Sequence, residues 1–321
     1  MDRSVDRRAV AAFLVLAYGL AWLAVLPLWL GDGLADPLFL ACALAMMAAP
    51  AAAALLVTRL VERPVPGAEA PGTARRLGLW PLAPFRRLVP YLAAGLFLPI
   101  VLVAGGLALG AVFGVYRPDL AGFSGFRAVL EQQAAASGVQ VPEVPTGVLV
   151  AAQCAGILVG AVINTVPALG EEIGWRGWLV PRLQPLGTVP MVLVSGVIWG
   201  LWHAPLILLG YNYPGLPGWL GLAAMCGMTT AFGAVLAWLR LASGSVWPAA
   251  LGHGALNASA GMMLLFSDAG MIDAGPFGID TAAVAPLGWT GWILPALASV
   301  LLFRMRAPGR EAPYSNRAPS G

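Results

Sequence analysis

The sequence contains no lysine, so all 18 of its basic residues are arginine. A Schiff-base lysine and a Walker phosphate loop both require lysine, which excludes enzymes built on either device. Charge of any kind is scarce: charged residues make up 10% of the 321 positions, and hydrophobic residues make up 59%. Soluble domains carry about 25% charged residues, so this composition excludes a water-soluble globular protein.

Cysteine and histidine are also rare, with three and two residues. Cys42, Cys154 and Cys226 all lie inside apolar runs. Their spacing indicates neither a disulfide framework nor a CxxC metal motif. We expect all three to be small buried hydrophobic residues.

Long apolar runs dominate the sequence, and several reach the roughly 20 residues needed to cross a bilayer. They predict an all-α fold, a polytopic transmembrane helical bundle of about eight spans. The predicted spans are 9–30, 36–58, 88–114, 148–169, 188–209, 218–239, 248–266 and 287–304. The first apolar run follows several arginines and so resembles the start of a signal peptide, but it is longer than the apolar region of a typical signal peptide. We therefore expect a retained helix.

The arginines predict the orientation of the bundle. Six of them lie in the 59–87 connector, which the positive-inside rule places in the cytoplasm. With both termini inside, alternation leaves only Arg117 and Arg127 outside and the other 16 arginines inside. The net charge of +3 therefore follows membrane topology and does not indicate a nucleic-acid partner. We predict a multi-pass protein of the bacterial inner (cytoplasmic) membrane, N-in and C-in.

No connector is long enough to separate two folded units. We assign residues 1–304 to a single membrane-embedded domain and residues 305–321 to a disordered cytoplasmic tail. Glycines four residues apart predict close helix contacts, namely at Gly106/Gly110, Gly156/Gly160 and Gly196/Gly200. Tryptophans near span ends are expected to form interfacial belts, among them Trp175, Trp178 and Trp219.

Ionisable residues inside or beside spans are costly to bury and often mark function. The few present here fall, with one amide, on three neighbouring spans of the predicted core: Glu171, Glu172, Arg176, His203, His253 and Asn257. Singly, each has a structural explanation, as a helix-end ion pair, an aromatic-belt histidine or an interhelical hydrogen-bonding pair. Their joint occurrence favours a functional site, because the structural explanation needs a separate reason for each.

Helical geometry separates the two glutamates. Glu172 and Arg176 are four residues apart and share a helix face in the favourable order, whereas Glu171 lies about 140° away from Arg176. Arg176 can therefore neutralise Glu172, and we predict that Glu171 faces the chemistry. His253 and Asn257 are also four apart, so both are expected to project from one helix face toward a common point.

Helix length decides whether these residues can meet. Glu171 ends its predicted span, while His203 is 15 residues into the next, a depth difference of roughly 22 Å. They can meet if the fourth helix continues past Gly170 and carries Glu171 deeper. We therefore predict one helix from about 160 to 183 despite Pro167.

Two other intramembrane protease designs do not fit the residues. A rhomboid-like serine site needs GxSG, but Leu193 stands two positions before Ser195. An aspartyl site needs two aspartates within spans, and all aspartates here lie in loops or the N-terminal tail.

The three motifs in order, Glu171-Glu172-x-x-x-Arg176, His203 and His253-x-x-x-Asn257, resemble the CPBP family of intramembrane CAAX-prenyl and bacteriocin-processing proteases, also called Abi proteins. The resemblance covers about residues 148–266, the motif-bearing core. It implies a site in a membrane cavity whose catalytic and supporting residues are Glu171, His203, His253 and Asn257, with Glu172 and Arg176.

The sequence departs from the family at Trp199, since the family usually has phenylalanine four residues before the histidine. Both residues are aromatic, so the departure bears on the packing beside His203 more than on the chemistry.

Peptide hydrolysis needs an activated water and donors to the tetrahedral oxyanion. In one scheme Glu171 is the general base, helped by His203, and His253 with Asn257 stabilises the oxyanion. In the other scheme a zinc ion is held by His203, His253 and a carboxylate, Glu171. No HExxH motif is present. We favour the metal-free scheme because Asn257 is a better oxyanion donor than zinc ligand.

We therefore predict an intramembrane endopeptidase that acts on a membrane-associated protein or peptide. The alternative is a non-catalytic scaffold or transporter-like protein whose polar cluster binds a ligand or partner. Transporters often show inverted repeats and paired broken helices, which we do not find in the sequence. The substrate is left open, although the lysine-free composition indicates a bacterial host, in which a prenylated CAAX substrate is not expected.

Overall fold

The computed structural model describes residues 5–62, 72–82, 84–140, 144–272 and 279–305. In chain order its helical elements are α1 (Arg7–Leu30), η1 (Gly33–Ala35), α2 (Phe39–Leu60), α3 (Thr73–Arg76), α4 (Phe85–Val112), α5 (Ser124–Ser137), α6 (Thr146–Glu172), η2 (Ile173–Leu179), α7 (Val180–Leu183), η3 (Gln184–Leu186), α8 (Thr188–Trp202), α9 (Ala204–Ile207), α10 (Gly218–Ser243), α11 (Trp247–Ser259), α12 (Met262–Leu265), η4 (Ala269–Met271) and α13 (Thr290–Arg304). The predicted tail lies outside the described residues, apart from Met305.

The predicted fold class is confirmed. Within the described ranges the regular structure is helical, and the only β pairing is an isolated bridge between Pro118 and Ser267. Five segments are long and apolar enough to cross a bilayer: α1, α2, α4, α10 and the continuous stretch Thr146–Leu186. The chain is therefore a multi-pass integral membrane protein.

Three of the eight predicted spans do not form full-length helices. Span 188–209 contains α8, which has 15 residues, span 287–304 contains α13, also 15 residues, and span 248–266 contains α11, with 13 residues. Helix α8 ends at Trp202 because Pro205 follows closely and has no N–H to continue the helical hydrogen bonds. The predicted span 248–266 is broken after Ser259, the last residue of α11, and the helix restarts at Met262, the first residue of α12.

The predicted continuation of the fourth helix is confirmed. Residues 146–183 form one helical stretch through Pro167, although residues 173–179 adopt π-helical geometry, which the sequence did not indicate. Two glycines in this π segment allow close backbone approach. A Cβ on Gly174 would meet Pro50 of α2 at 2.4 Å, and one on Gly177 would meet the Leu77 carbonyl at 2.9 Å.

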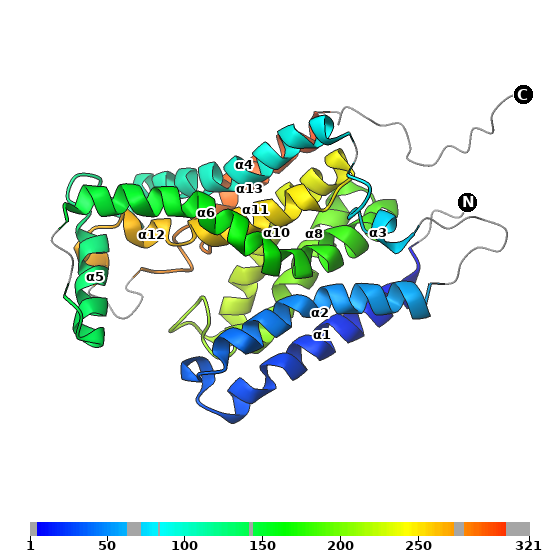
Figure 1. Cartoon of the computed structure of the whole chain (residues 1–321), viewed down its shortest axis with the longest axis horizontal. Helices are drawn as coiled ribbons and strands as arrows, with labels where there is room; N and C mark the ends of the chain where they lie inside the picture. Colours follow the sequence, from blue (N-terminus) through cyan, green and yellow to red (C-terminus); the bar gives the residue numbers. More distant parts are fainter. Residues whose placement is uncertain (1–4, 63–71, 83, 141–143, 273–278, 306–321) are drawn as a thin grey trace, which may run out of the picture.

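Helices α1 and α2 pack on the rest of the bundle through α6 and η2, and α1 also contacts α8 and α9. Helices α1 and α2 make an antiparallel hairpin along one edge, and α2 packs against α6 (Figure 1). Helix α11 lies between α6 and α4, while α10 packs against α8 and α13. At the far end α5 stands across the direction of α6 (Figure 1).

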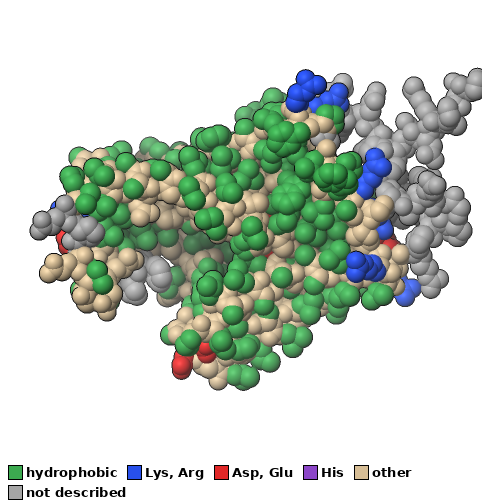
Figure 2. Space-filling view, in the orientation of Figure 1, with side chains coloured by type: hydrophobic (Ala, Val, Ile, Leu, Met, Phe, Trp, Pro, Cys, Tyr) green, Lys and Arg blue, Asp and Glu red, His purple; other side chains and the backbone are tan. Residues whose placement is uncertain are grey.

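Arginine marks one end of the molecule. Helices α1 and α4 begin there, and α2 and α13 finish there (Figure 1). Figure 2 shows arginines at that end and hydrophobic side chains over most of the remaining face. The face is also hollowed between the α1–α2 hairpin and the end that carries α5 (Figure 2). This distribution agrees with a cytoplasmic arginine-rich end, and the N-in orientation stays a prediction.

The predicted glycine contacts are present with one exception. A Cβ would clash with a neighbouring segment at Gly106, Gly196 and Gly200 and would sit tightly at Gly110 and Gly160, but Gly156 has nothing within 4 Å.

Two further expectations need correction. Trp175 and Trp178 are fully buried core residues and not interfacial ones, while Trp219 is 71% exposed. The indoles of η2 pack inward because their segment continues into the bundle. Of the cysteines only Cys42 is buried; Cys226 is half-buried and Cys154 is exposed on α6, whose surface there faces away from the other helices.

Candidate functional site

Two adjacent glutamates form the last residues of α6, just before the π segment. Their side chains are 3% and 0% exposed for Glu171 and Glu172, in a part of the bundle with few other charges. Roughly 12 residues separate Glu171 from Leu183, a rise of about 18 Å. This rise along the helix places Glu171 at a depth similar to that of His203, which follows the last residue of α8.

Glu172 is held by two partners through one oxygen. Its Oε1 accepts a hydrogen bond from Arg176 at 2.7 Å and lies 3.0 Å from Nδ1 of His253 on α11. Its Oε2 is buried and has no partner among the described residues. The predicted pairing of Glu172 with Arg176 is therefore present. The same Glu172 oxygen also orients His253.

Glu171 makes no ion pair with Arg176 among the described residues, and it contacts two indoles. Its Oε2 accepts a hydrogen bond from Nε1 of Trp199 at 2.8 Å and a longer one from Nε1 of Trp175 at 3.4 Å. Within the described part of the chain, no hydrogen bond is made to its Oε1. One carboxylate oxygen is thus fixed while the other is left for a water or substrate.

His203 is the residue at which α8 ends. Its Nδ1 lies 2.8 Å from the carbonyl oxygen of Trp199, one helical turn earlier. A carbonyl can only accept, so Nδ1 carries the proton and Nε2 of the neutral ring carries the lone pair. The ring packs edge-on against Trp202 at 4.9 Å between centroids and is half-buried.

Asn257 is separated from this cluster. It follows His253 by one turn of α11, but His253 is buried and Asn257 is exposed. Its side chain makes no hydrogen bond to any residue that the structure describes. Of the six predicted site residues, the structure brings together Glu171, Glu172, Arg176, His203 and His253 and leaves Asn257 at the margin.

Trp175 was expected in an interfacial belt and Trp199 only in the packing beside His203, but both belong to the cluster. Both donate indole N–H groups to Glu171. A signal exists in the sequence, because Trp175 follows Glu171 by four residues and Trp199 precedes His203 by four, the spacing of side chains that share a helix face.

Metal binding would depend on how many donor side chains lie together. Nε2 of His203 and Nε2 of His253 are chemically suited to zinc, since Nδ1 of each ring has a second partner. Across the described ranges, however, no three His, Cys, Asp or Glu side chains lie close enough together to hold a metal ion. Zinc binding by Glu171, His203 and His253 therefore stays a prediction.

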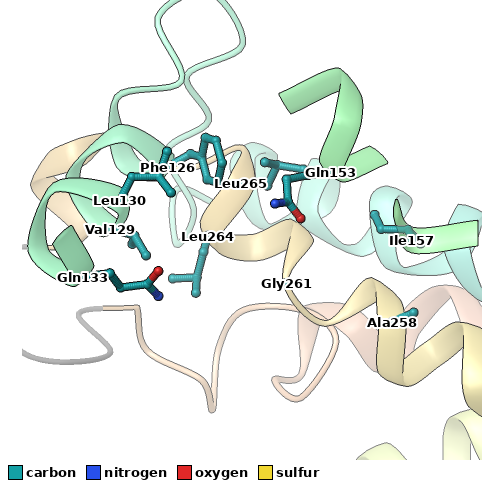
Figure 3. A pocket seen from close by; sticks show the side chains of 10 residues that line it. All are labelled: Phe126, Val129, Leu130, Gln133, Gln153, Ile157, Ala258, Gly261, Leu264 and Leu265. Carbon is teal, nitrogen blue, oxygen red and sulfur yellow. The ribbon is translucent and has the colours of Figure 1, made fainter. Parts of the chain in front are cut away.

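A separate pocket lies toward the other end of α6. It has a volume of about 240 Å³ and lies between α5, the first half of α6 and the α11–α12 break (Figure 3). Its walls are apolar except for the amides of Gln133 and Gln153 (Figure 3). None of the predicted site residues lines it, although Ala258 follows Asn257 directly.

Comparison with known proteins places this site in a matched segment. Residues 153–259 match the family described as type II CAAX prenyl endopeptidase Rce1-like, and they include all six predicted site residues. A similar curated protein is CAAX prenyl protease 2 of Methanococcus maripaludis, 27% identical over 120 residues. The aligned part covers 36% of this chain and 44% of that relative, so less than half of the relative is matched.

Proposed function

We propose that the chain is an intramembrane endopeptidase, because residues 153–259 match the family described as type II CAAX prenyl endopeptidase Rce1-like. It hydrolyses a peptide bond of a membrane-associated protein or peptide. The observation that carries the proposal is the buried cluster of Glu171, Glu172, Arg176, His203 and His253 inside an apolar bundle. Ionisable groups are expensive at such a place, which favours a chemical role over a purely structural one.

Glu171 is the general base of the proposed reaction. The two indoles hold Oε2, so Oε1 takes a proton from a water whose oxygen bonds to the substrate carbonyl carbon. His203 then relays this proton through Nε2 to the leaving nitrogen, and the C–N bond breaks. Glu171 returns to its carboxylate form, and the products are a carboxylic acid and an amine.

His253 stabilises the oxyanion. In its protonated form it donates Nδ1–H to Glu172 and Nε2–H to the developing negative oxygen, the arrangement by which a buried carboxylate orients a catalytic histidine. Asn257 lies one turn further along α11, and its amide makes no hydrogen bond to a described residue. The carbonyl oxygen of a bound substrate would lie between the side chains of His253 and Asn257.

The relative's name specifies prenylated CAAX proteins, and this chain's substrate is proposed only as a membrane-associated peptide. A prenylated C-terminal peptide and an unmodified membrane peptide are therefore both tested. Purified protein in liposomes is given each peptide, with and without 1,10-phenanthroline. We expect cleavage that resists the chelator, because no step above uses a metal; loss of cleavage on chelation would overturn the metal-free scheme alone.

Replacing the base tests the endopeptidase itself. Protein termini are compared by mass spectrometry in membranes that carry the wild type, Glu171→Gln or the control Glu131→Gln, whose carboxylate lies on the exposed face of α5. We expect new termini with the wild type and with Glu131→Gln, and loss of at least about 100-fold with Glu171→Gln. Identical termini in all three, at equal protein levels, would instead support a non-catalytic scaffold or transporter-like role.

A further inference from the structure

Trp199 contacts four of the five clustered site residues, namely Glu171, Arg176, His203 and His253. It lies on α8, is 2% exposed, and its indole N–H donates to Oε2 of Glu171 at 2.8 Å. Its backbone carbonyl accepts from Nδ1 of His203, also at 2.8 Å. One residue thereby orients both the proposed base and the proposed proton relay.

The indole ring makes two further contacts within the cluster. The guanidinium of Arg176 lies 4.1 Å from the ring centroid, within the range of a cation–π contact. The ring of His253 meets it edge-on, with 5.2 Å between centroids and 71° between planes. Because Arg176 and His253 share Oε1 of Glu172, the indole fixes the spacing between the two carboxylates.

We propose that Trp199 is the positioning residue of the site, and that its N–H selects which oxygen of Glu171 acts as the base. A carboxylate with two free oxygens can rotate and present either of them. A donor at 2.8 Å on a buried, rigid ring holds Oε2 and leaves Oε1 as the reacting atom. The expected kinetic effect of Trp199 rests on the proposed endopeptidase function. The hydrogen bond from Trp199 to Glu171 can be tested whether or not the protein is an endopeptidase.

The molecule contains a matched control in Trp178. Its indole is also fully buried and also carries an arginine, Arg182, at 4.1 Å from the ring centroid. Its N–H, however, has no partner among the described residues. Trp199→Phe and Trp178→Phe therefore remove the same atoms from the same kind of environment, and only the first removes a hydrogen bond to a carboxylate.

The hydrogen bond itself is measured by NMR on protein labelled with ¹⁵N at the tryptophan indoles, in nanodiscs. The Trp199 signal is identified by its loss in Trp199→Phe, and the Trp178 signal by its loss in Trp178→Phe. We expect Glu171→Ala to move the Trp199 proton signal upfield by about 1 ppm and to leave the Trp178 signal in place. A Trp199 signal that does not respond to Glu171 would overturn the proposal.

The kinetic consequence is measured on the same proteins with a peptide that the wild type cleaves. We expect Trp199→Phe to lower kcat by about 10- to 100-fold with KM unchanged, the effect of losing a hydrogen bond to a charged group. Trp178→Phe should stay within about threefold of the wild type in both constants. Equal kcat values for the two variants would overturn the positioning role. A wild type without peptidase activity would overturn the proposed function, and the NMR result alone would then decide the positioning.

Discussion

Glu172 and Arg176 form an ion pair that is almost sealed from solvent, with side chains 0% and 3% exposed. The chain offers a second pair with the same four-residue spacing, Arg127 and Glu131 on α5, whose side chains are 64% and 57% exposed. Removing one member of a buried pair leaves the other charge uncompensated, whereas an exposed partner is solvated by water. The two pairs therefore separate the effect of burial from that of sequence spacing.

We expect Arg176→Met to lower the free energy of unfolding by about 3–5 kcal/mol and Arg127→Met to change it by less than about 0.5 kcal/mol. The measurement is reversible unfolding in mixed micelles, followed by tryptophan fluorescence. The double variant Glu172→Gln/Arg176→Met should recover part of the loss, since neither charge is then left alone. A loss from Arg176→Met no larger than that from Arg127→Met would contradict the structural role assigned to this pair.

Among the helices, the π segment η2 (Ile173–Leu179) is the element that shapes the site. It carries Trp175 and Arg176 inward while α6 and α7 continue on either side. Short π segments are rare and often occur at functional sites. Close approach of α2 to this segment depends on Gly174, where a Cβ would lie 2.4 Å from the Cβ of Pro50 and 2.7 Å from its carbonyl oxygen.

Substituting this glycine tests the packing of the π segment. Gly174→Ala should destabilise the protein by about 1–3 kcal/mol, because the neighbouring backbone of α2 cannot move aside cheaply. Gly156→Ala on the same helical stretch is the control; nothing lies within 4 Å of its added Cβ, and alanine favours the helix by up to about 1 kcal/mol. Thermal unfolding in detergent compares the two. Similar melting temperatures would mean that α2 and η2 are not packed as described.

For the molecule as a whole, the arginine-rich end defines an orientation. The N-in, C-in prediction is tested by cysteine labelling in a variant whose three native cysteines are replaced by alanine. We expect Gln132→Cys on α5 to react with an impermeant maleimide in intact spheroplasts. Ala74→Cys on α3, at the opposite end (Figure 1), should react only after permeabilisation. The reverse pattern would invert the orientation and move the arginine-rich end outside.

The sequence by itself determined the class of the protein and predicted most of the residues of its candidate site. Low charge and long apolar runs permit only a membrane-embedded helical bundle. The four-residue spacing of Glu172 and Arg176 fixed their pairing and the divergence of Glu171, because helix geometry is local. The continuation of α6 past Gly170 also followed from the sequence, as the way in which Glu171 and the histidine on the next span could reach the same depth.

Only the tertiary structure decided what lies between those residues. The placement of Trp199 against Glu171, Arg176 and His253 depends on how α8 packs relative to η2 and α11, and no local pattern encodes such distances. The shortening of three spans depends on breaks near Pro205 and Gly261 and on partners that cover the ends. The exposure of Asn257 one turn after the buried His253 likewise depends on how the neighbouring helices pack around α11, a property of the assembled bundle.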